Sequence, residues 1–413
     1  MIEAKTERIR QDLEAMGRIT ATPGAGMTRF SFTEEHRLTR DYISGRMKEA
    51  GLAVFQDEAG NLFGRREGTC EGAPAVMVGS HFDSVKNGGI FDGPAGVVMG
   101  LEVARILHDE NIKTRYPLEF AALVEEEGAR FGGGLHGSRV MAGLVRREML
   151  DSFKDRDGVS MAEAMSAFGL NPDLITSAVR PAESLKAFIE MHIEQGPVLE
   201  NEGVEVGLVK TIVGISQKEI EILGRPDHAG TTPMEMRCNA LTAAAEAALF
   251  LDEAARKAGG GTVSTVGRME VYPGGTNIVP GRVFFTIDVR AAEMARIKQV
   301  TDAFVEFLKS LEKRGLEVRV TDRITVPPVD MSPEILELFA AEARKRGYSS
   351  KVMQSGAGHD AMIMAGITDA GLVFVPSKGG RSHCPDEWTD YGQIKKGVDV
   401  VLGAVLSLAE AEV

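Results

Sequence analysis

Three short apolar segments that end in or carry histidine or acidic residues most constrain how this chain can fold. They cover residues 75–79, 118–124 and 187–193, and they deliver Ser80-His81, the run Glu125-Glu126-Glu127, and His192. Apolar runs of this length are typical of buried strands, and open α/β sheets bind ligands at the carboxyl ends of their strands. With a helix predicted over residues 94–107, the pattern favours an α/β fold with a mostly parallel or mixed sheet flanked by helices.

The pattern changes near residue 213. Strands are predicted at 217–223, 263–271, 282–289 and 316–321, and helices at 239–257 and 292–314. This β-α-β-β-α-β order matches the ferredoxin-like split βαβ unit. Because His383 and an apolar strand at 372–375 follow it, we expect a discontinuous domain of residues 1–213 and 328–413, interrupted by an inserted domain of residues 214–327.

Composition narrows the partners and the compartment. The formal net charge of -13 argues against nucleic acid and anionic membranes as partners, and no apolar run approaches the roughly 20 residues that a membrane span needs. Residues 1–19 are predicted as an amphipathic helix rather than a signal peptide. The cysteines, Cys70, Cys238 and Cys384, are odd in number and form no CxxC pair, so we expect a reducing cytoplasm.

Five scattered residues together indicate a metal site. They are His81, Asp92, Glu127, His192 and His383. Three imidazoles and two carboxylates suit a pair of divalent metals, and such pairs hydrolyse carbonyl compounds. Zinc, manganese, cobalt and nickel all accept nitrogen and oxygen ligands of this kind. The set therefore predicts a hydrolase with two divalent metal ions.

The immediate sequence around these residues suggests roles. Asp83 lies two positions after His81, so in extended chain it points the same way and can accept the other ring N–H. Asp92, between glycines and a helix, suits a bridging carboxylate but also an N-cap. Adjacent strand-end residues diverge, so we assign Glu127 as a ligand and Glu126 as the general base of hydrolysis.

Other candidates have ordinary structural alternatives. By default His228 is structural, Arg290 forms a surface salt bridge, and Asn277 belongs to a turn. Cys384 follows His383 but is more readily a small core side chain than a ligand. The segment 356–360 is either a tight loop or a backbone N–H cradle for an anion.

Seven ordered motifs together resemble the amidase, hydantoinase/carbamoylase branch of the M20 metallopeptidase clan. They occupy residues 79–85, 87–93, 126–131, 192–197, 228–234, 355–360 and 382–383, so the resemblance covers nearly the whole chain. The branch includes N-carbamoyl-L-amino-acid hydrolases, allantoate amidohydrolases and β-ureidopropionases. The resemblance implies that His81 and His192 bind one metal, that Glu127 and His383 bind the other, and that Asp92 bridges them.

The resemblance also implies roles for the inserted domain and the substrate. The domain is expected to be a lid that also forms a homodimer, with His228 reaching the neighbouring site to stabilise the tetrahedral oxyanion. Arg290, Asn277 and the backbone at Gly358 are expected to hold the carboxylate of a small anionic ureido substrate. Gln195 and Gln217 are expected to contact its ureido or amide end.

The function implied is hydrolysis of N-carbamoyl-L-amino acids to the L-amino acid, carbon dioxide and ammonia. Allantoate amidohydrolase and β-ureidopropionase remain alternatives with the same site. A dipeptidase or aminoacylase of the clan is less favoured, because the peptidases usually carry an acidic ligand where this chain has His192. A non-catalytic binding protein of the same fold is disfavoured by Glu126 and the full ligand set.

Overall fold

The computed structural model of the chain describes residues 2–412. They divide into two compact units. The first comprises the residues up to Lys210, Asp330–Met353 and the residues from Gly358 onward, and the second comprises Thr211–Val329 and Gln354–Ala357. The first unit is therefore discontinuous in sequence, with the second inserted into it.

A nine-stranded mixed sheet forms the centre of the first unit, in the order β1-β2-β5-β3-β6-β14-β7-β12 with β13 beside β7. Strand β3 pairs in parallel with β5 and β6, and β6 with β14, whereas β1, β2 and β7 join antiparallel. The mixed sheet expected from the sequence is thus confirmed. The bounds are β1 Ala53–Gln56, β2 Leu62–Arg66, β3 Ala75–His81, β5 Leu118–Leu123, β6 Leu185–Ile193, β7 Val206–Ile212, β12 Val329–Asp330, β13 Ser350–Ser355 and β14 Asp369–Val375.

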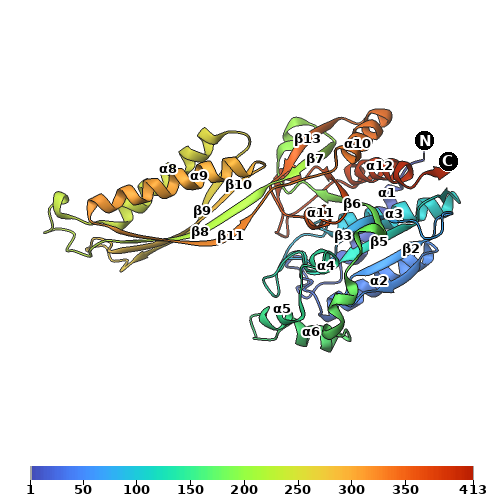
Figure 1. Cartoon of the computed structure of the whole chain (residues 1–413), viewed down its shortest axis with the longest axis horizontal. Coiled ribbons are helices and arrows are strands. Elements are labelled where there is room, and N and C mark those ends of the chain that lie inside the picture. The colour runs from blue at the N-terminus through green and yellow to red at the C-terminus, as the bar shows by residue number, and fades with distance from the viewer. Residues whose placement is uncertain (1, 413) are drawn as a thin grey trace. The chain divides into compact units, whose positions relative to one another are not determined.

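Helices cover both faces of this sheet (Figure 1). On one face, Gly100 of α3 approaches Phe120, and Gly371 of β14 approaches Phe339 of α10. On the other, the backbone N–H of Ala361 in α11 donates to Oε2 of Glu190 in β6 at 2.8 Å. The helices are α1 Thr6–Gly17, α2 Glu34–Glu49, α3 Pro94–Asp109, α4 His136–Met141, α5 Arg147–Ser152, α6 Met161–Phe168, α7 Val198–Glu202, α10 Pro333–Arg346, α11 Asp360–Met364 and α12 Tyr391–Leu408.

Shorter elements complete the first unit. The predicted N-terminal helix over residues 1–19 is present as α1, Thr6–Gly17, and Met1 lies outside the described residues. Strands β4 and β15 pair antiparallel near the carboxyl end of the chain. Their bounds and those of the 3-10 turns are β4 Lys113–Thr114, β15 Ala411–Glu412, η1 Pro172–Ala178, η2 Ala182–Ser184 and η5 Lys378–Gly380.

The second unit is a four-stranded antiparallel sheet in the order β11-β8-β10-β9, with two long helices along one face (Figure 1). Along β10 the buried residues alternate, and Val283, Phe285 and Ile287 pack against the helices. Half-buried polar residues on the opposite face include Asp288 and Arg290. The bounds are β8 Gly214–Leu223, η3 Met234–Met236, α8 Ala240–Ala258, β9 Val263–Tyr272, β10 Arg282–Ala291, α9 Met294–Leu311, η4 Glu312–Arg314 and β11 Glu317–Val326.

Strand β11 of this unit departs most from its predicted bounds. Strand β11 continues to Val326, whereas the pattern predicts an end at Thr321. The extra residues are mostly exposed, so they carry little of the apolar alternation from which a strand is predicted. Pairing with β8, through a register shift between Asp322 and Ile324, holds them in the sheet.

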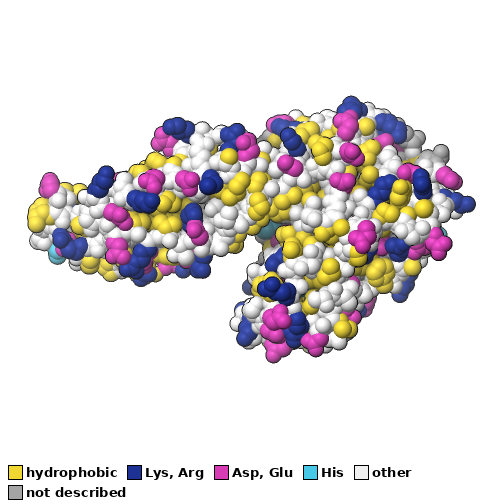
Figure 2. All heavy atoms as spheres, viewed as in Figure 1, with side chains coloured by type: hydrophobic (Ala, Val, Ile, Leu, Met, Phe, Trp, Pro, Cys, Tyr) yellow, Lys and Arg dark blue, Asp and Glu magenta, His cyan; other side chains and the backbone are white. Residues whose placement is uncertain are grey.

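The surface carries mixed charge. Acidic and basic side chains are interspersed over the visible face of the molecule (Figure 2), and many form ion pairs such as Arg323 with Glu219 and Arg147 with Asp151. Within residues 2–412, no helix combines the length and apolar character that crossing a membrane requires.

Candidate metal centre

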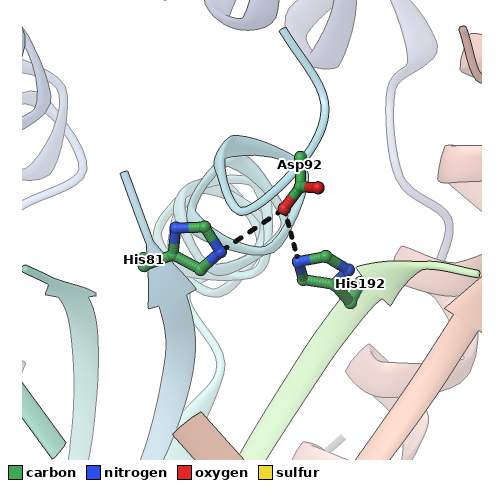
Figure 3. A group of neighbouring side chains, drawn as sticks. All are labelled: His81, Asp92 and His192. Atoms are coloured by element: carbon green, nitrogen blue, oxygen red, sulfur yellow. Dashed lines mark ion pairs between the residues drawn. The ribbon is translucent and has the colours of Figure 1, made fainter. Parts of the chain in front are cut away.

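Three residues from neighbouring elements converge at the carboxyl ends of two parallel strands (Figure 3). His81 is the last residue of β3, His192 lies near the end of β6, and Asp92 lies just before α3. Oδ1 of Asp92 lies 3.2 Å from Nε2 of His192 and 3.6 Å from Nε2 of His81. All three side chains are buried, and their donor atoms are close enough to hold one metal ion.

A second group shares Asp92 through its other oxygen. Oδ2 of Asp92 lies 3.3 Å from Nε2 of His383, which lies 3.4 Å from Oε2 of Glu127. These three residues form a second set that can hold a metal ion. Each oxygen of Asp92 thus faces a different group, the geometry that a bridging carboxylate needs. The structure brings all five of the sequence-predicted ligands together, whereas Cys384 belongs to neither group.

The chemistry of the donor set fits divalent cations. Oε1 of Glu127 is buried and has no hydrogen-bond partner among the described residues, and a buried unsatisfied carboxylate oxygen is costly. Burial and the nearby charge of Asp92 raise the pKa of Glu127 to about 7. A cation at this position would satisfy the oxygen and offset the repulsion. The nitrogen and oxygen donors suit zinc, manganese, cobalt or nickel.

Close backbone packing holds His81 in place. Gly93, with φ of 79°, lies against the imidazole of His81, and a Cβ at this position would overlap the ring. Only glycine therefore fits between the ring and the start of α3. Burial opposes protonation of His81, but the nearby carboxylates, Glu126 foremost, raise its pKa well above the usual value.

Asp83 connects the two strand ends. Its carboxylate oxygens accept hydrogen bonds from the backbone N–H groups of Glu126 and Glu127, at 3.1 and 3.2 Å. Nδ1 of His81 lies 3.6 Å from the Asp83 carboxylate and 3.3 Å from its main-chain oxygen. Asp83 thus lies beside Nδ1 of His81, as the sequence predicts. Through its two hydrogen bonds it also fixes the loop after β5.

Glu126 lies at the edge of the first group. Its Oε2 is 3.7 Å from Nε2 of His81. Burial raises the pKa of Glu126 well above the ordinary value, and the neighbouring carboxylates of Glu127 and Asp360 add to this effect. A carboxylate in such an environment can accept and hold a proton at neutral pH.

Sequence reasoning missed Glu387, which supports the shared ligand. Oε1 of Glu387 accepts the backbone N–H groups of Phe91 and Asp92, each at 3.0 Å. Ser382 Oγ donates to Asp92 Oδ2 at 2.6 Å and lies 3.0 Å from Glu387 Oε2. Glu387 is buried, but in sequence it resembles its exposed neighbour Asp386, so no local signal identifies it.

Gln195 and Gly358 also lie in the first unit. Gln195 has a left-handed φ of 57°, and its Nε2 donates to Asp92 Oδ2 at 2.7 Å. Its Oε1 is buried without a hydrogen-bond partner among residues 2–412. Gly358 precedes His359, whose ring centroid lies 4.6 Å from that of His192.

The remaining sequence-predicted residues belong to the second unit. His228 is exposed, and its Nδ1 accepts the N–H groups of Gly230 and Thr231 at 3.1 and 3.2 Å. The main-chain oxygen of Asn277 accepts the N–H of Ala229 at 2.9 Å. Arg290 pairs with Asp288, and Nε2 of Gln217 donates to Asp288 Oδ2 at 2.9 Å.

Comparisons with known proteins cover almost the full chain. A family model described as peptidase family M20/M25/M40 matches residues 77–407. An N-carbamoyl-L-amino-acid amidohydrolase of Paenarthrobacter aurescens is 44% identical over 407 residues, 98% of this chain and 98% of that protein. An allantoate amidohydrolase of Escherichia coli is 34% identical, covering 99% of each chain. A hydantoinase/carbamoylase family amidase structure from Burkholderia multivorans matches with TM-score 0.93 and 36% identity, covering 99% of this chain and 98% of that one.

Proposed function

The chain belongs to peptidase family M20/M25/M40, and on that premise we propose that it hydrolyses the ureido C–N bond of N-carbamoyl-L-amino acids. The products are the L-amino acid, carbon dioxide and ammonia. The observation that carries the proposal is the shared carboxylate of Asp92, with one oxygen facing each of two ligand groups and Glu126 beside the first. Two relatives that align over 98% and 99% of this chain are named as amidohydrolases of N-carbamoyl-L-amino acids and of allantoate.

Two divalent metal ions complete the proposed site. His81 and His192 would hold one ion, Glu127 and His383 would hold the other, and Asp92 would contribute one carboxylate oxygen to each group. When bound, such ions polarise the substrate carbonyl and lower the pKa of water. The buried Glu127 Oε1, which lacks a hydrogen bond within the described residues, supports this assignment.

Glu126 is the proposed general base. It removes a proton from the water whose oxygen attacks the carbamoyl carbon, and it delivers that proton to the terminal nitrogen. The bond between carbon and that nitrogen then breaks and ammonia leaves. The remaining carbamate loses carbon dioxide and releases the amino acid. Burial, which raises the pKa of the Glu126 carboxyl, supports a residue that holds a proton between the two steps.

The second unit is proposed to be a ferredoxin-like lid and dimerisation domain of residues 214–327, inserted into a catalytic domain of residues 1–213 and 328–413. Its βαββαβ element order and antiparallel strand order support this. His228 is proposed to stabilise the oxyanion in the neighbouring subunit. Because its Nδ1 accepts backbone N–H groups, the neutral ring carries its proton on Nε2 and can donate there.

Substrate recognition is assigned to both units. Arg290, Asn277 and the backbone of Gly358 are proposed to bind the carboxylate, and Gln195 and Gln217 the ureido end. The unsatisfied Oε1 of Gln195 supports its role, since it can accept a ureido N–H.

The three free cysteines, with Cys70 exposed, support a reducing cytoplasm as the compartment.

Allantoate is the second candidate substrate, because the relative from Escherichia coli named for it also aligns over 99% of this chain. A β-ureidopropionase would use the same groups. A dipeptidase or aminoacylase is less favoured, because His192 of the first ligand group stands where peptidases of the clan usually have an acidic ligand.

The proposal is tested by ammonia release from N-carbamoyl-L-amino acids, N-carbamoyl-D-amino acids, ureidopropionate and allantoate, with dipeptide cleavage measured in parallel. We expect the highest kcat/KM for an N-carbamoyl-L-amino acid and low turnover of its D enantiomer. Preference for allantoate would select the second candidate. Dipeptide cleavage without ammonia release would reject both.

A further inference from the structure

Asp288 holds the guanidinium of Arg290 on the open face of the second unit's sheet. Nε of Arg290 donates to Asp288 Oδ1 at 2.9 Å, and Nη2 donates to Oδ2 at 3.1 Å. The two residues lie two positions apart on β10 and therefore share a face. Bidentate pairs of this kind fix the orientation of the guanidinium plane as well as its position.

Two further hydrogen bonds complete the arrangement. Nη1 of Arg290 donates to the main-chain oxygen of Gly356 at 2.7 Å. Nε2 of Gln217, on the adjacent strand β8, donates to Asp288 Oδ2 at 2.9 Å. Both oxygens of Asp288 are thus engaged, and its carboxylate is held from the neighbouring strand.

The arrangement leaves part of the guanidinium available. A guanidinium has five N–H donors, and three of them make the bonds to Asp288 and Gly356. One N–H on each of Nη1 and Nη2 remains. The side chain of Arg290 is 34% exposed and lines an open groove of about 790 Å³ together with Gln217, Thr265 and Arg323.

We propose that Asp288 is a positioning residue for substrate recognition, which orients Arg290 so that its two remaining N–H groups meet the substrate carboxylate. Gln217 acts behind it by fixing Asp288 through Nε2, in addition to the ureido contact already proposed for it. The inference rests on the proposed function, because it requires Arg290 to bind that carboxylate.

The pair also determines what kind of anion is recognised. Asp288 offsets the charge of Arg290, so the pair attracts anions weakly at long range. Binding then depends on short, directional hydrogen bonds, which a planar carboxylate satisfies well. By fixing the two remaining N–H groups of Arg290, Asp288 therefore favours a carboxylate that matches their spacing over anions of other shapes.

The test is a double-mutant cycle on N-carbamoyl-L-alanine with Asp288→Ala, Arg290→Ala and the double variant. We expect Asp288→Ala to raise KM about tenfold, the size of one lost charge-assisted contact, with kcat changed less than about threefold. The double variant should match Arg290→Ala within about twofold, because Asp288 acts only through Arg290. Asp288→Asn, which keeps one acceptor oxygen, should lie between wild type and Asp288→Ala.

Glu219→Ala is the matched control. Glu219 lines the same groove and pairs with Arg323 at 2.7 Å, so its loss removes an ion pair of the same sheet face without touching Arg290. We expect its KM to stay at the wild-type value. A wild-type KM for Asp288→Ala, or a loss that persists in the Arg290→Ala background, would overturn the inference. An unchanged KM for Arg290→Ala alone would instead reject the carboxylate site of the proposed function.

Discussion

The backbone N–H of Asp92 donates a hydrogen bond to Oε1 of Glu387 at 3.0 Å, although 295 residues separate them in the chain. The shared residue of both ligand groups is therefore positioned from the far end of the sequence. Glu387 and Ser382 also contact each other at 3.0 Å, and Ser382 contacts the Asp92 side chain. Asp92 is therefore held both at its backbone N–H and at its side-chain carboxylate.

Replacement of Glu387 by Ala should weaken metal binding about 10- to 100-fold, the usual effect of removing a group that orients a ligand. The N–H groups of Phe91 and Asp92, which now bond Glu387, would be left without their acceptor. Metal content after dialysis against a graded chelator series measures the effect. Glu387→Gln keeps an acceptor oxygen and should retain more metal, and wild-type retention by the Ala variant would refute the role.

Replacement of Glu126 by Gln should lower kcat by about 10²- to 10⁴-fold, because the proposed general base is lost. Metal content should stay near the wild-type value, since Glu126 belongs to neither ligand group. Glu127→Gln is the matched variant, and it should lose metal as well as activity. Full turnover by Glu126→Gln would show that another residue is the base.

Mixed dimers test whether His228 serves the neighbouring site. His228→Ala and Glu126→Gln homodimers should each be nearly inactive. Random 1:1 mixing places one intact site in each heterodimer, so about a quarter of wild-type activity should return if a twofold dimer shares its sites. Ammonia release after subunit exchange measures this. A mixture no more active than its parents would argue against a residue crossing between subunits.

Removal of metal should lower the melting temperature. The buried carboxylates of Asp92 and Glu127 lose their counterions, and an ion that binds only the folded chain adds about 2.7 kcal/mol at 100 times its Kd. Calorimetry with a chelator, then with zinc, manganese, cobalt or nickel added back, measures the shift. The His228→Ala variant should keep this metal-dependent shift in melting temperature, and the Asp92→Asn variant should lose most of it. A chelator-insensitive melting temperature in the wild type would contradict a structural contribution from the ions.

His36 should make stability depend on pH in mildly acidic solution. Its ring is buried and stacks on Phe168, and burial lowers its pKa to about 3. Between this value and the ordinary pKa near 6.5, the unfolded chain binds a proton that the folded chain does not. The free energy of unfolding therefore decreases as pH falls from about 6.5 toward 3, by up to about 1.4 kcal/mol per pH unit.

Urea unfolding of metal-free protein between about pH 4.5 and 6.5 measures this dependence, so that release of metal does not contribute. The His36→Gln side chain cannot titrate. Its free energy of unfolding should therefore depend less steeply on pH, by up to about 1.4 kcal/mol per pH unit. Nδ1 of His36 accepts the N–H of Phe32 at 2.7 Å, and the Gln oxygen can replace that acceptor. Equal slopes in the two proteins would mean that His36 is protonated when folded.

Much of the fold follows from local pattern. The apolar runs at 75–79, 118–124 and 187–193 correspond to β3, β5 and β6, because residues buried on both faces of a sheet must be apolar along the strand. The end of β11 was not predictable in this way, since its mostly exposed residues 322–326 are held by pairing with β8 rather than by burial.

The sequence by itself determined which side-chain types this chain offers: three imidazoles, two carboxylates suited to metal binding and an adjacent Glu126, each in a distinctive local context. Only the tertiary structure decided how these groups are supported. It placed Glu387 behind Asp92 and Gln195 against its carboxylate, and it joined Asp288 to Arg290 and Gln217. Ligand types are a property of side chains and can be read residue by residue. Hydrogen bonds between distant segments depend on where the folded backbone brings them, and no local pattern records that.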